Sequence, residues 1–473
     1  MKISIIPQRN VSSRVLIPII SGQHETLFRL HPGEHYKGDA MSHFIGTSAH
    51  DESPVILIGL GTLEAKKVVK SVRHFFHTQA SKFSNQFHLT LTHLPEDTQR
   101  DVLIGLFLSN YDIQKYKSDK KPADTISISL DLTGNQIREE AAHIAESMMQ
   151  TMNLVDEPAN FLTPAALANQ VQNLATEHLV DCGIWDEERL RSEGFHAILA
   201  VGRGSKNAPR LIHARYRSAE LPADAPKYCL IGKGITYDSG GLSIKQTASM
   251  QHMKCDMAGA ATIIGFFDLV NRLKMPMHLD ILIPAAENLI DANGYKPGDI
   301  ISSYSGKTIE ITDTDAEGRV VLADALSYAV KNLQPDCIID LATLTGSAIN
   351  TLGNQAAALF SNQQDLAQEL LKAGEDTSER LWQLPLWDSY ADDLHSDMAD
   401  LRNYSGKPTA GAITAAKFLE AFIDKHPSWA HIDFAGMVYG DGPFAKTKTA
   451  TAYGIRLLHR FFQNRIQSTS TKN

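Results

Sequence analysis

Apolar residues in the first third of the chain occur in short runs that are rich in aliphatic and β-branched side chains. The runs are VLIPII (15–20), PVILIGL (54–60), HLTLTHL (88–94) and ISISLDL (126–132). Helical patterns such as LEAKKVVKSVRHFF (63–76) separate them. Runs of this length predict strands, and their alternation with helical segments predicts a small α/β domain over residues 1–135.

The next segment shows a regular helical period. Its apolar residues recur at intervals of three and four: Ile137, Ala141, Ile144, Met148 and Met152. This spacing places them on one face of a helix. The stretch DEPANFLTP (156–164) contains two prolines and other turn-forming residues, which predicts a break in the chain. We therefore expect a connecting helix and linker over residues 136–165.

Residues 166–473 alternate longer buried-strand runs with helical segments. The strand runs are HAILAVG (196–202), KYCLIG (227–232), LDILIPAAEN (279–288), DCIIDLATLTG (336–346) and AHIDFAG (430–436). The helical segments are GAATIIGFFDLVNRL (259–273), GRVVLADALSYAVKNL (318–333) and TAAKFLEAFIDKH (414–426). This order predicts an α/β fold, in which a larger C-terminal catalytic domain holds a central mixed, largely parallel sheet flanked by helices.

Length and composition agree with this organisation. A chain of 473 residues is too long for one ordinary core, so two domains are expected. Hydrophobic residues make up 43% and charged residues 21%, which is typical of globular proteins. The net charge is −9 and no basic block is present, so we expect small ligands and neither a nucleic-acid partner nor an anionic membrane.

The cysteines and the N-terminal segment bear on the compartment. Four cysteines occur, without a CxxC pair, which predicts neither a disulfide framework nor a thiolate zinc site. The chain start lacks the charged-then-apolar pattern of a signal peptide. Apolar runs such as VILIGL are shorter than the ~20 residues of a membrane span. We therefore expect a cytoplasmic protein.

The stretch TDTDAEGRVVLADAL (312–326) places Asp313, Asp315 and Glu317 at alternate positions. On an extended chain such side chains point the same way, and like charges destabilise one another unless a cation lies among them. Acidic clusters before a helix are, however, more often solvated or stabilised by the positive helix N-terminus. Taken alone, the stretch does not predict a metal site.

Two other segments carry charge where a strand run ends. GKGITYDSGGLSIK (232–245) holds Lys233, Asp238 and Lys245 in a glycine-rich loop, and MKCDMAGAA places Asp256 at the start of a helix. Each is ordinary by itself, because glycine-rich loops commonly only turn. Ligands of open α/β sheets nevertheless bind beyond the carboxyl ends of strands, so these segments could meet.

Convergence of Asp238, Asp256, Asp315 and Glu317 would bring together about four negative charges, which two divalent cations ~3.5–4 Å apart would neutralise. Oxygen-rich ligation without cysteine favours Zn²⁺, Mn²⁺, Mg²⁺ or Co²⁺. The nineteen histidines include no HExxH pair, so the common zinc-protease motif is absent.

These segments, in this order and followed by DLATLTG, resemble the signature of the leucyl aminopeptidase (cytosol aminopeptidase) family of dinuclear metallo-exopeptidases. The resemblance continues through AVGRGS, KPGDIISSYSGKTIEI and AGAITAAKFLEAF and covers about residues 150–460. The N-terminal region is only weakly similar. SIKQTA and VGRGS further resemble the peptidase B branch.

The resemblance implies a metal-dependent aminopeptidase that removes the N-terminal residue from peptides with a free α-amine, using a water activated by two metal ions. One ion would be held by Lys233, Asp238, Asp256 and Glu317. The other would be held by Asp238, Asp315 and Glu317 with the carbonyl of Asp315. Lys245 and Arg319 would be the catalytic pair, with bicarbonate beside Arg319 as a proton shuttle. The family's homohexamer, with active sites facing an interior cavity, is implied as well.

Physical chemistry is compatible with these implied roles. A lysine binds metal only as the neutral amine, and removing its proton at neutral pH costs roughly 4–5 kcal/mol, which an adjacent dication must offset. A charged Lys245 would stabilise a developing oxyanion. By the resemblance, the substrate side chain would contact Met253, Thr343, Gly346 and Ala435, whose apolar or small character suits Leu and Met. Asp313 stands where the family usually has Asn.

Three other functions are less well supported. SGKT (305–308) and CIID (337–340) imitate phosphate-binding NTPase motifs, but Ile301 stands where the loop needs glycine, and TIEIT predicts a strand, so SGKT is interpreted as a hairpin turn. An architectural DNA-binding role, which proteins of the family can have, lacks a basic surface. A serine hydrolase is disfavoured because Ser239 in DSGG lacks the GxSxG elbow.

Overall fold

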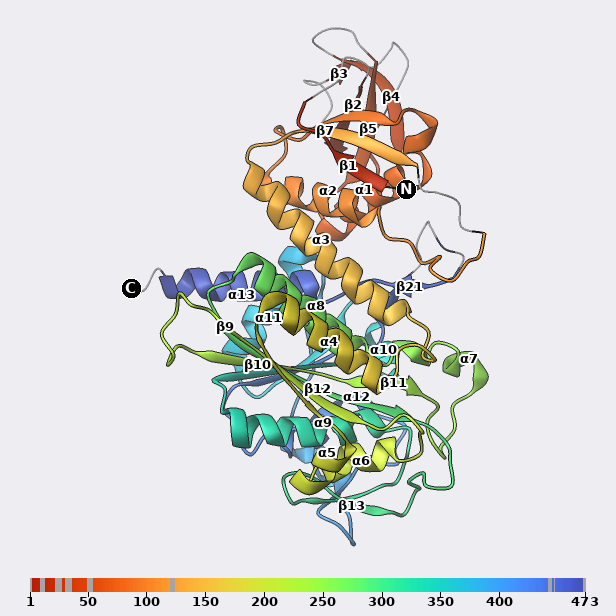
Figure 1. Cartoon of the computed structure of the whole chain (residues 1–473), viewed down its shortest axis with the longest axis vertical. Coiled ribbons are helices and arrows are strands. Elements are labelled where there is room, and N and C mark those ends of the chain that lie inside the picture. The colour runs from red at the N-terminus through yellow and green to blue at the C-terminus, as the bar shows by residue number, and fades with distance from the viewer. Residues whose placement is uncertain are drawn as a thin grey trace. The chain divides into compact units, whose positions relative to one another are not determined.

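The computed structural model describes residues 2–8, 13–21, 28–29, 36–48, 54–119, 124–440, 445 and 447–470. The chain divides into two compact units (Figure 1). The first unit comprises Met1–Met149 with two short later segments, and the second comprises Gln150–Glu375, Glu379–Gly440 and Ala450–Asn473. The domain boundaries expected from the sequence, at residues 135 and 165, remain predictions.

The first unit is built on a seven-stranded mixed sheet of order β1-β7-β6-β2-β5-β4-β3. Its strands are β1 (Lys2–Ile5), β2 (Arg14–Ile20), β3 (Phe28–Arg29), β4 (His43–Ser48), β5 (Pro54–Gly61), β6 (Gln86–Thr90) and β7 (Thr125–Asp131). Along this sheet, the neighbouring strands β1, β7, β6, β2 and β5 pair in parallel, whereas β4 pairs antiparallel with β5 and β3 pairs antiparallel with β4. Helices α1 (Ala65–Thr78) and α2 (Glu96–Leu108) accompany the sheet. The four strand runs and the helix predicted for this part of the chain are confirmed.

Helix α3 (Asn135–Asp156) includes the predicted connecting helix. Its five periodic apolar residues are all buried, as their spacing predicts. After the break at 157–163, helix α4 (Pro164–His178) begins where the side chain of Thr163 accepts a hydrogen bond from the amide of Ala166 and proline occupies the first helical position. Both features are typical of a helix N-terminus.

The second unit contains a nine-stranded sheet of order β17-β16-β19-β15-β10-β12-β9-β8, with β11 paired to β12. The strands are β8 (Asp181–Trp185), β9 (Arg210–Arg217), β10 (Lys227–Gly232), β11 (Gly234–Asp238), β12 (His278–Asn288), β15 (Cys337–Ala342), β16 (Ala357–Ser361), β17 (Leu381–Gln383) and β19 (Trp429–Asp433). The four central strands β12, β10, β15 and β19 are parallel, so their carboxyl ends share one edge. The predicted mixed, largely parallel sheet is confirmed.

Helices cover both faces of this sheet. Figure 1 shows α8 (Ala258–Leu273) and α9 (Glu317–Tyr328) on opposite sides of it. The remaining helices of the second unit are α5 (Glu187–Glu193), α6 (His196–Gly202), α7 (Thr247–Met250), α10 (Gly346–Leu352), α11 (Gln364–Thr377), α12 (Gly411–Glu420) and α13 (Ile455–Ser470). Short strands are β13 (Ile300–Ser302), β14 (Thr308–Glu310), β18 (Leu401–Arg402), β20 (Tyr439–Gly440) and β21 (Thr449–Ala450). Across the described residues, every helix is too short or too polar to cross a membrane.

One strand prediction is wrong. The run HAILAVG forms helix α6 instead, and both its first amides, of Ala197 and Ile198, donate 3.0 Å hydrogen bonds to a carboxylate oxygen of Asp324. The five consecutive apolar residues 197–201 carry no period that separates a buried strand from a buried helix. A side chain 126 and 127 positions away in sequence stabilises the helix N-terminus, so the choice is tertiary.

The interpretation of SGKT as a hairpin turn is confirmed. Strands β13 and β14 pair antiparallel, with Ser302 opposite Thr308, and Gly306 adopts a φ of 90° in the turn between them. A positive φ of this size is accessible to glycine at little cost.

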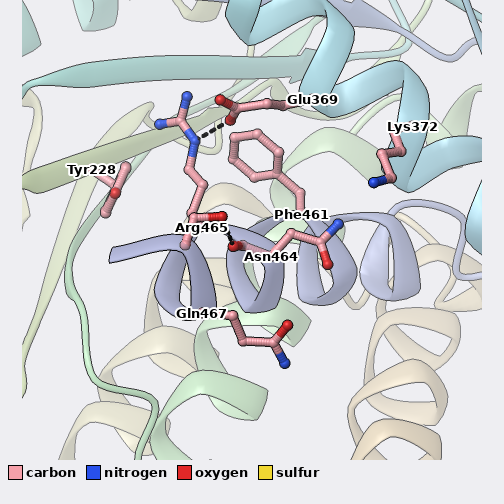
Figure 2. A pocket seen from close by; sticks show the side chains of 8 residues that line it. Tyr228, Glu369, Lys372, Phe461, Asn464, Arg465 and Gln467 are labelled. Carbon is pink, nitrogen blue, oxygen red and sulfur yellow. Dashed lines mark hydrogen bonds and ion pairs between the residues drawn. The ribbon is translucent and has the colours of Figure 1, made fainter. Parts of the chain in front are cut away.

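A surface pocket of about 590 Å³ lies between α11, α13 and the start of β10 (Figure 2). The guanidinium of Arg465 lies over the rings of Tyr228 and Phe461 and forms an ion pair with Glu369. The Arg465 cation is therefore already paired and stacked, and these contacts pack α13 against α11 and β10.

Candidate metal centre

The predicted ligands meet at the carboxyl edge of the second unit's sheet. Strand β10 ends at Gly232 and β15 at Ala342, so Lys233 and Thr343 follow neighbouring parallel strands. The Lys233 ammonium donates to the Thr343 carbonyl at 3.0 Å. A Cβ on Gly318 would lie 2.5 Å from the Lys233 side chain, and a Cβ on Gly259 would lie 2.1 Å from the Leu341 carbonyl. Glycine at both positions therefore lets α8 and α9 approach the lysine.

Lys233 is buried between two carboxylates. Its ammonium lies 2.8 Å from Asp256 Oδ2 and 2.9 Å from Glu317 Oε1. Burial by itself lowers the pKa of Lys233, but the negative charges of Asp256 and Glu317 outweigh burial and raise it. In the protein without metal, this lysine is a cation that partly neutralises the acidic cluster.

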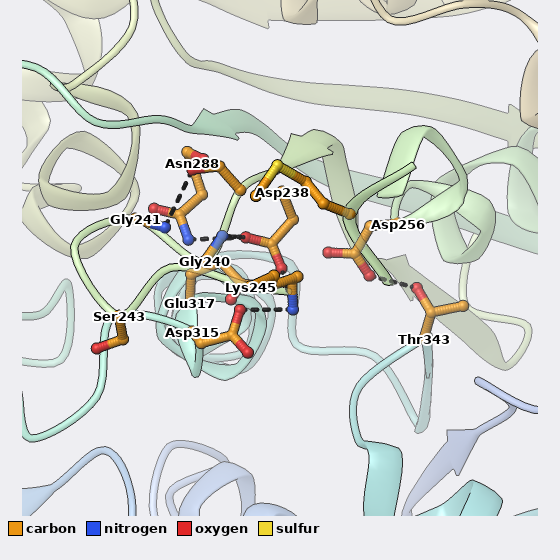
Figure 3. Close-up of polar contacts among 12 residues, drawn as sticks. Asp238, Gly240, Gly241, Ser243, Lys245, Asp256, Asn288, Asp315, Glu317 and Thr343 are labelled. Carbon is orange, nitrogen blue, oxygen red and sulfur yellow. Dashed lines mark hydrogen bonds and ion pairs between the residues drawn. The ribbon is translucent and has the colours of Figure 1, made fainter. Parts of the chain in front are cut away.

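Lys245 makes the second cationic contact (Figure 3). Its ammonium lies 2.9 Å from Asp238 Oδ2 and 2.5 Å from Asp315 Oδ1. The other oxygen of Asp238 accepts hydrogen bonds from the amide of Gly240 and the side chain of Asn288, both at 2.8 Å. Asp238 is therefore oriented from one side by the loop and by β12, with its second oxygen towards Lys245.

The carboxylates outnumber the lysines. Asp238, Asp256, Asp315 and Glu317 carry four negative charges if ionised, against two positive charges on Lys233 and Lys245. Oxygen atoms of Asp238, Asp315 and Glu317 all lie within 4.8 Å of one another. In addition, buried Glu317 Oε2 receives no hydrogen bond from any described residue. An acceptor-only oxygen without a donor, in a cluster short of positive charge, fits a bound cation.

The pKa values reflect this crowding. Burial and the nearby charge of Glu317 raise the pKa of Asp238, and burial raises that of Asp256 well above its ordinary range despite Lys233. The pKa of Asp315 rises to about 7, first through burial and then through Asp238 and Glu317. Burial would also raise the pKa of Glu317, but Lys233 and Lys245 lower it. Burial and mutual repulsion therefore disfavour negative charge on most of these carboxylates.

Arg319 lies in the first turn of α9 and is buried. One Nη donates to the backbone carbonyl of Asn403 at 3.0 Å, while Nε finds no acceptor among the described residues. Burial lowers the pKa of Arg319, against the opposing charges of Glu317 and Asp433. A guanidinium with a spare donor beside an acidic cluster is able to hold a small anion.

The acidic stretch is a turn that leads into α9 rather than an extended strand. Glu317 is the first residue of α9, and Asp313 Oδ1 accepts the backbone amide of Asp315 at 2.8 Å. The three carboxylates do not share one face of an extended segment, because the side chain of Asp313 turns back onto its own loop. Only Asp315 and Glu317 of the three belong to the group of oxygens that could hold an ion.

The residues expected to contact the substrate side chain lie on three segments. Met253 begins the short turn that leads into Asp256, and Thr343 Oγ1 donates to Asp256 Oδ1 at 2.8 Å. Gly346 begins α10 and is exposed, with open space where a Cβ would stand. The amide of Ala435 donates to Asp433 Oδ1 at 3.3 Å.

Asp433 joins two of these segments and was not singled out from the sequence. Its other oxygen accepts a 2.6 Å hydrogen bond from the hydroxyl of Thr345, and its Oδ1 also accepts the amide of Leu344. Asn288 ends a predicted strand run, so inspecting every strand end would have found it, whereas Asp433 ends β19 but lies inside its predicted run (430–436). Asn403 follows the two-residue strand β18, which the sequence does not indicate.

Comparison with known proteins identifies close relatives. Residues 149–459 match the model of the cytosol aminopeptidase family, catalytic domain. A probable cytosol aminopeptidase of Syntrophotalea carbinolica is 44% identical over 377 residues, which cover 77% of this chain and 75% of the relative. The crystal structure of the cytosol aminopeptidase from Coxiella burnetii superposes with a TM-score of 0.82 at 32% identity, covering 97% of this chain and 99% of that one. The bottromycin maturation enzyme BotP in complex with Mn superposes with a TM-score of 0.85 at 29% identity, covering 96% and 99%.

Proposed function

Because this chain belongs to the cytosol aminopeptidase family of metal-dependent exopeptidases, we propose that Lys233, Asp238, Asp256, Asp315 and Glu317 form its two-metal catalytic centre. The protein is an aminopeptidase, a hydrolase that removes N-terminal residues from peptides. The observation that carries the proposal is the meeting of these five side chains at one sheet edge. Lys233 lies within ion-pair distance of Asp256 and Glu317, and oxygens of Asp238, Asp315 and Glu317 lie within 4.8 Å of one another.

One ion would be held by Lys233, Asp238, Asp256 and Glu317, and the other by Asp238, Asp315 and Glu317 with the carbonyl of Asp315. The short distances from Lys233 to Asp256 and Glu317 support the first set, and the cluster of Asp238, Asp315 and Glu317 supports the second. The Mn in the BotP complex supports a divalent ion, and Zn²⁺ and Mn²⁺ are the favoured choices, with Mg²⁺ or Co²⁺ as others. Lys233 must lose its proton to bind metal, so metal affinity should fall in acid.

The bound ions would supply Lewis acidity and a nucleophilic water at neutral pH. Lys245 would then act on the peptide oxygen. Burial alone lowers the pKa of Lys245, but Asp238 and Glu317 raise it above its ordinary value, so its ammonium stays charged and can stabilise negative charge that develops on that oxygen. Bicarbonate held against Arg319 would supply a proton shuttle, which the unpaired Nε–H of that guanidinium supports.

Exopeptidase specificity follows if the substrate's free α-amine binds in the acidic cluster. The side chain of the N-terminal residue would contact Met253, Thr343, Gly346 and Ala435. Small and apolar walls favour Leu, Met and other mainly apolar residues over charged ones.

The chain would assemble as a homohexamer with its active sites facing an interior cavity. Large apolar side chains on the surface of the second unit support contacts between copies, because Trp382 and Trp387 are 64% and 66% exposed and Met398 is 76% exposed. A cytoplasmic location is supported by the name of the Syntrophotalea relative. The net charge of −9 gives no support to a nucleic-acid partner.

The proposal is tested by release of N-terminal leucine from a short peptide. The protein is assayed after chelation, after restoring Zn²⁺, Mn²⁺ or Mg²⁺, and with the peptide amine acetylated. We expect activity only with metal and only with the free amine. Cleavage that resists chelation would exclude the proposed centre.

A further inference from the structure

We infer that Asn403 is a positioning residue for this centre: it holds the acidic loop (residues 312–316) through its side-chain amide and Arg319 through its backbone carbonyl. The inference rests on the proposed function, since it concerns the same site. Asn403 is completely buried and lies about 90 positions after the loop that it contacts.

The side-chain amide of Asn403 bonds the loop in both directions. Its Oδ1 accepts the amides of Thr312 at 2.8 Å and Asp313 at 3.3 Å. Its Nδ2 donates to the carbonyl of Asp313 at 2.6 Å and to that of Ala316 at 3.4 Å. The metal-donor residue Asp315 lies between the two carbonyls that are held, so the amide fixes the loop on both sides of it.

The backbone of Asn403 reaches the catalytic arginine. Its carbonyl accepts the 3.0 Å hydrogen bond from Arg319, and its own amide donates to the carbonyl of Glu310 at 2.9 Å. Strand β18 pairs with β14 directly before this point, with Arg402 opposite Glu310. Asn403 therefore extends the parallel pairing of β18 with β14, and β14 leads directly into the acidic loop.

Only a short amide side chain meets these requirements. An aspartate in its place keeps the acceptor but places a carboxylate against the carbonyls of Asp313 and Ala316, and an alanine leaves buried backbone groups without partners. Residues that orient metal ligands in this way typically change metal affinity or activity by 10- to 100-fold when they are replaced, so roughly that loss is expected here.

The test compares Asn403→Asp with Asn362→Asp. Asn362 makes a similar two-way bridge, from Trp429 N to Oδ1 at 2.9 Å and from Nδ2 to the His426 carbonyl at 2.7 Å, at the opposite end of β19 from the site. For each variant we measure the Mn²⁺ dissociation constant by calorimetry, kcat and KM for a leucyl peptide, and the Tm of the chelated protein.

We expect Asn403→Asp to weaken Mn²⁺ binding and lower kcat, each roughly 10- to 100-fold, with KM changed less than about threefold. Asn362→Asp should lower Tm less, because Asn362 is exposed whereas Asn403 is buried, and should leave the Mn²⁺ dissociation constant and kcat unchanged. Asn403→Ala, which adds no charge, is measured as well, so that an Asn403→Asp protein that does not fold still leaves a test.

Equal Mn²⁺ binding and kcat in the Asn403 and Asn362 variants would overturn the inference. Losses confined to Tm would overturn it too, because they would show a merely structural role. Asp238→Ala, measured alongside, separates the two hypotheses: if that variant loses metal while the Asn403 variants do not, the proposed centre stands and the role of Asn403 fails.

Discussion

Strand β12 has buried carboxylates near both ends, one near its start and several near its end, and the balance of positive and negative charge differs between the two sites. Near its start, Asp280 accepts bonds from His213 Nε2 at 2.7 Å and Arg217 Nη2 at 2.6 Å, with Arg215 Nε at 3.2 Å. At its end, Asn288 bonds to Asp238, where four carboxylates share two lysines. One carboxylate bonded by two guanidiniums and a histidine stands against four carboxylates that share the positive charges of two lysines.

The pKa values follow this balance. Burial alone would raise the pKa of Asp280, but hydrogen bonds from His213 and Arg217 lower it below its ordinary value. The pKa values of Asp238 and Asp256 are raised instead. Burial of a carboxylate therefore does not by itself indicate a functional site. A shortage of positive charge around several carboxylates does, since a cation must then make up the difference.

The largest effect is expected for Asp238→Ala and Glu317→Ala. Both residues are shared by the two proposed ion positions, so either change should remove metal binding and lower leucine release by roughly 10³-fold or more. The fold should survive, because each change relieves repulsion in the cluster. Calorimetric Mn²⁺ titration, peptide hydrolysis and the Tm of the chelated protein check this. Full activity in the Asp238→Ala protein would contradict the assignment.

Asp280→Ala should lower the stability of the fold and leave metal binding unchanged. Removing the only carboxylate of that site leaves buried His213 and two partly exposed guanidiniums without their partner, and losing hydrogen bonds to a charged group typically costs roughly 1.5–3 kcal/mol. Urea unfolding of the chelated protein measures the loss, and Mn²⁺ affinity should stay within about twofold of the wild type. A large loss of metal affinity with intact stability would mean that the two ends of β12 do not differ as described.

The same substitution can be compared at Arg319, beside the acidic cluster, and at Arg217, beside Asp280. Arg319→Ala should lower kcat by roughly 10²-fold or more with metal retained, as for the loss of one donor that stabilises charge during the reaction. Arg217→Ala should lower the free energy of unfolding, because that guanidinium bonds Asp280, and leave kcat unchanged. Steady-state kinetics and urea unfolding of both variants test the contrast, which fails if both lose the same property.

The contribution of Asp280 to stability should depend on pH. Because folding lowers its pKa below the ordinary 3.8, the unfolded chain binds this proton more readily. The contribution is complete above pH ~4 and is lost as the pH falls through the lower value of the folded protein. The difference in unfolding free energy between wild type and Asp280→Asn should thus shrink below pH ~4. A difference that grew on acidification would contradict the assigned direction.

The smallest effect is expected for Asp313→Asn, which restores the usual family residue. The Oδ1 of asparagine can accept the same amide of Asp315, and the lost charge is only half-buried. Metal affinity and kcat/KM should change by about twofold or less. A tenfold change in Mn²⁺ affinity would show that the added carboxylate tunes the centre.

The sequence predicted much of the fold because the relevant signals are local. The period of Ile137 to Met152 predicted α3, and the alternation of apolar runs predicted the parallel sheet. The segments that carry the proposed ligands were located by the charges that follow strand runs. These inferences need only neighbouring residues, since helical and strand periods extend over a few positions.

Other features depend on residues distant in sequence. Helix α6 exists where a strand was expected because Asp324 bonds its first amides, and Asn403 reaches the acidic loop although no pattern marks it.

What the sequence determined by itself is therefore the element order, the family and the segments that bear the ligands. Only the tertiary structure decided which carboxylates share a lysine, that Asp313 turns away to its own loop, and that the pKa of Asp280 is lowered while those of Asp238 and Asp256 are raised. The physical reason is that electrostatic balance depends on distances between side chains, and those distances are set by strand order and helix packing rather than by position along the chain.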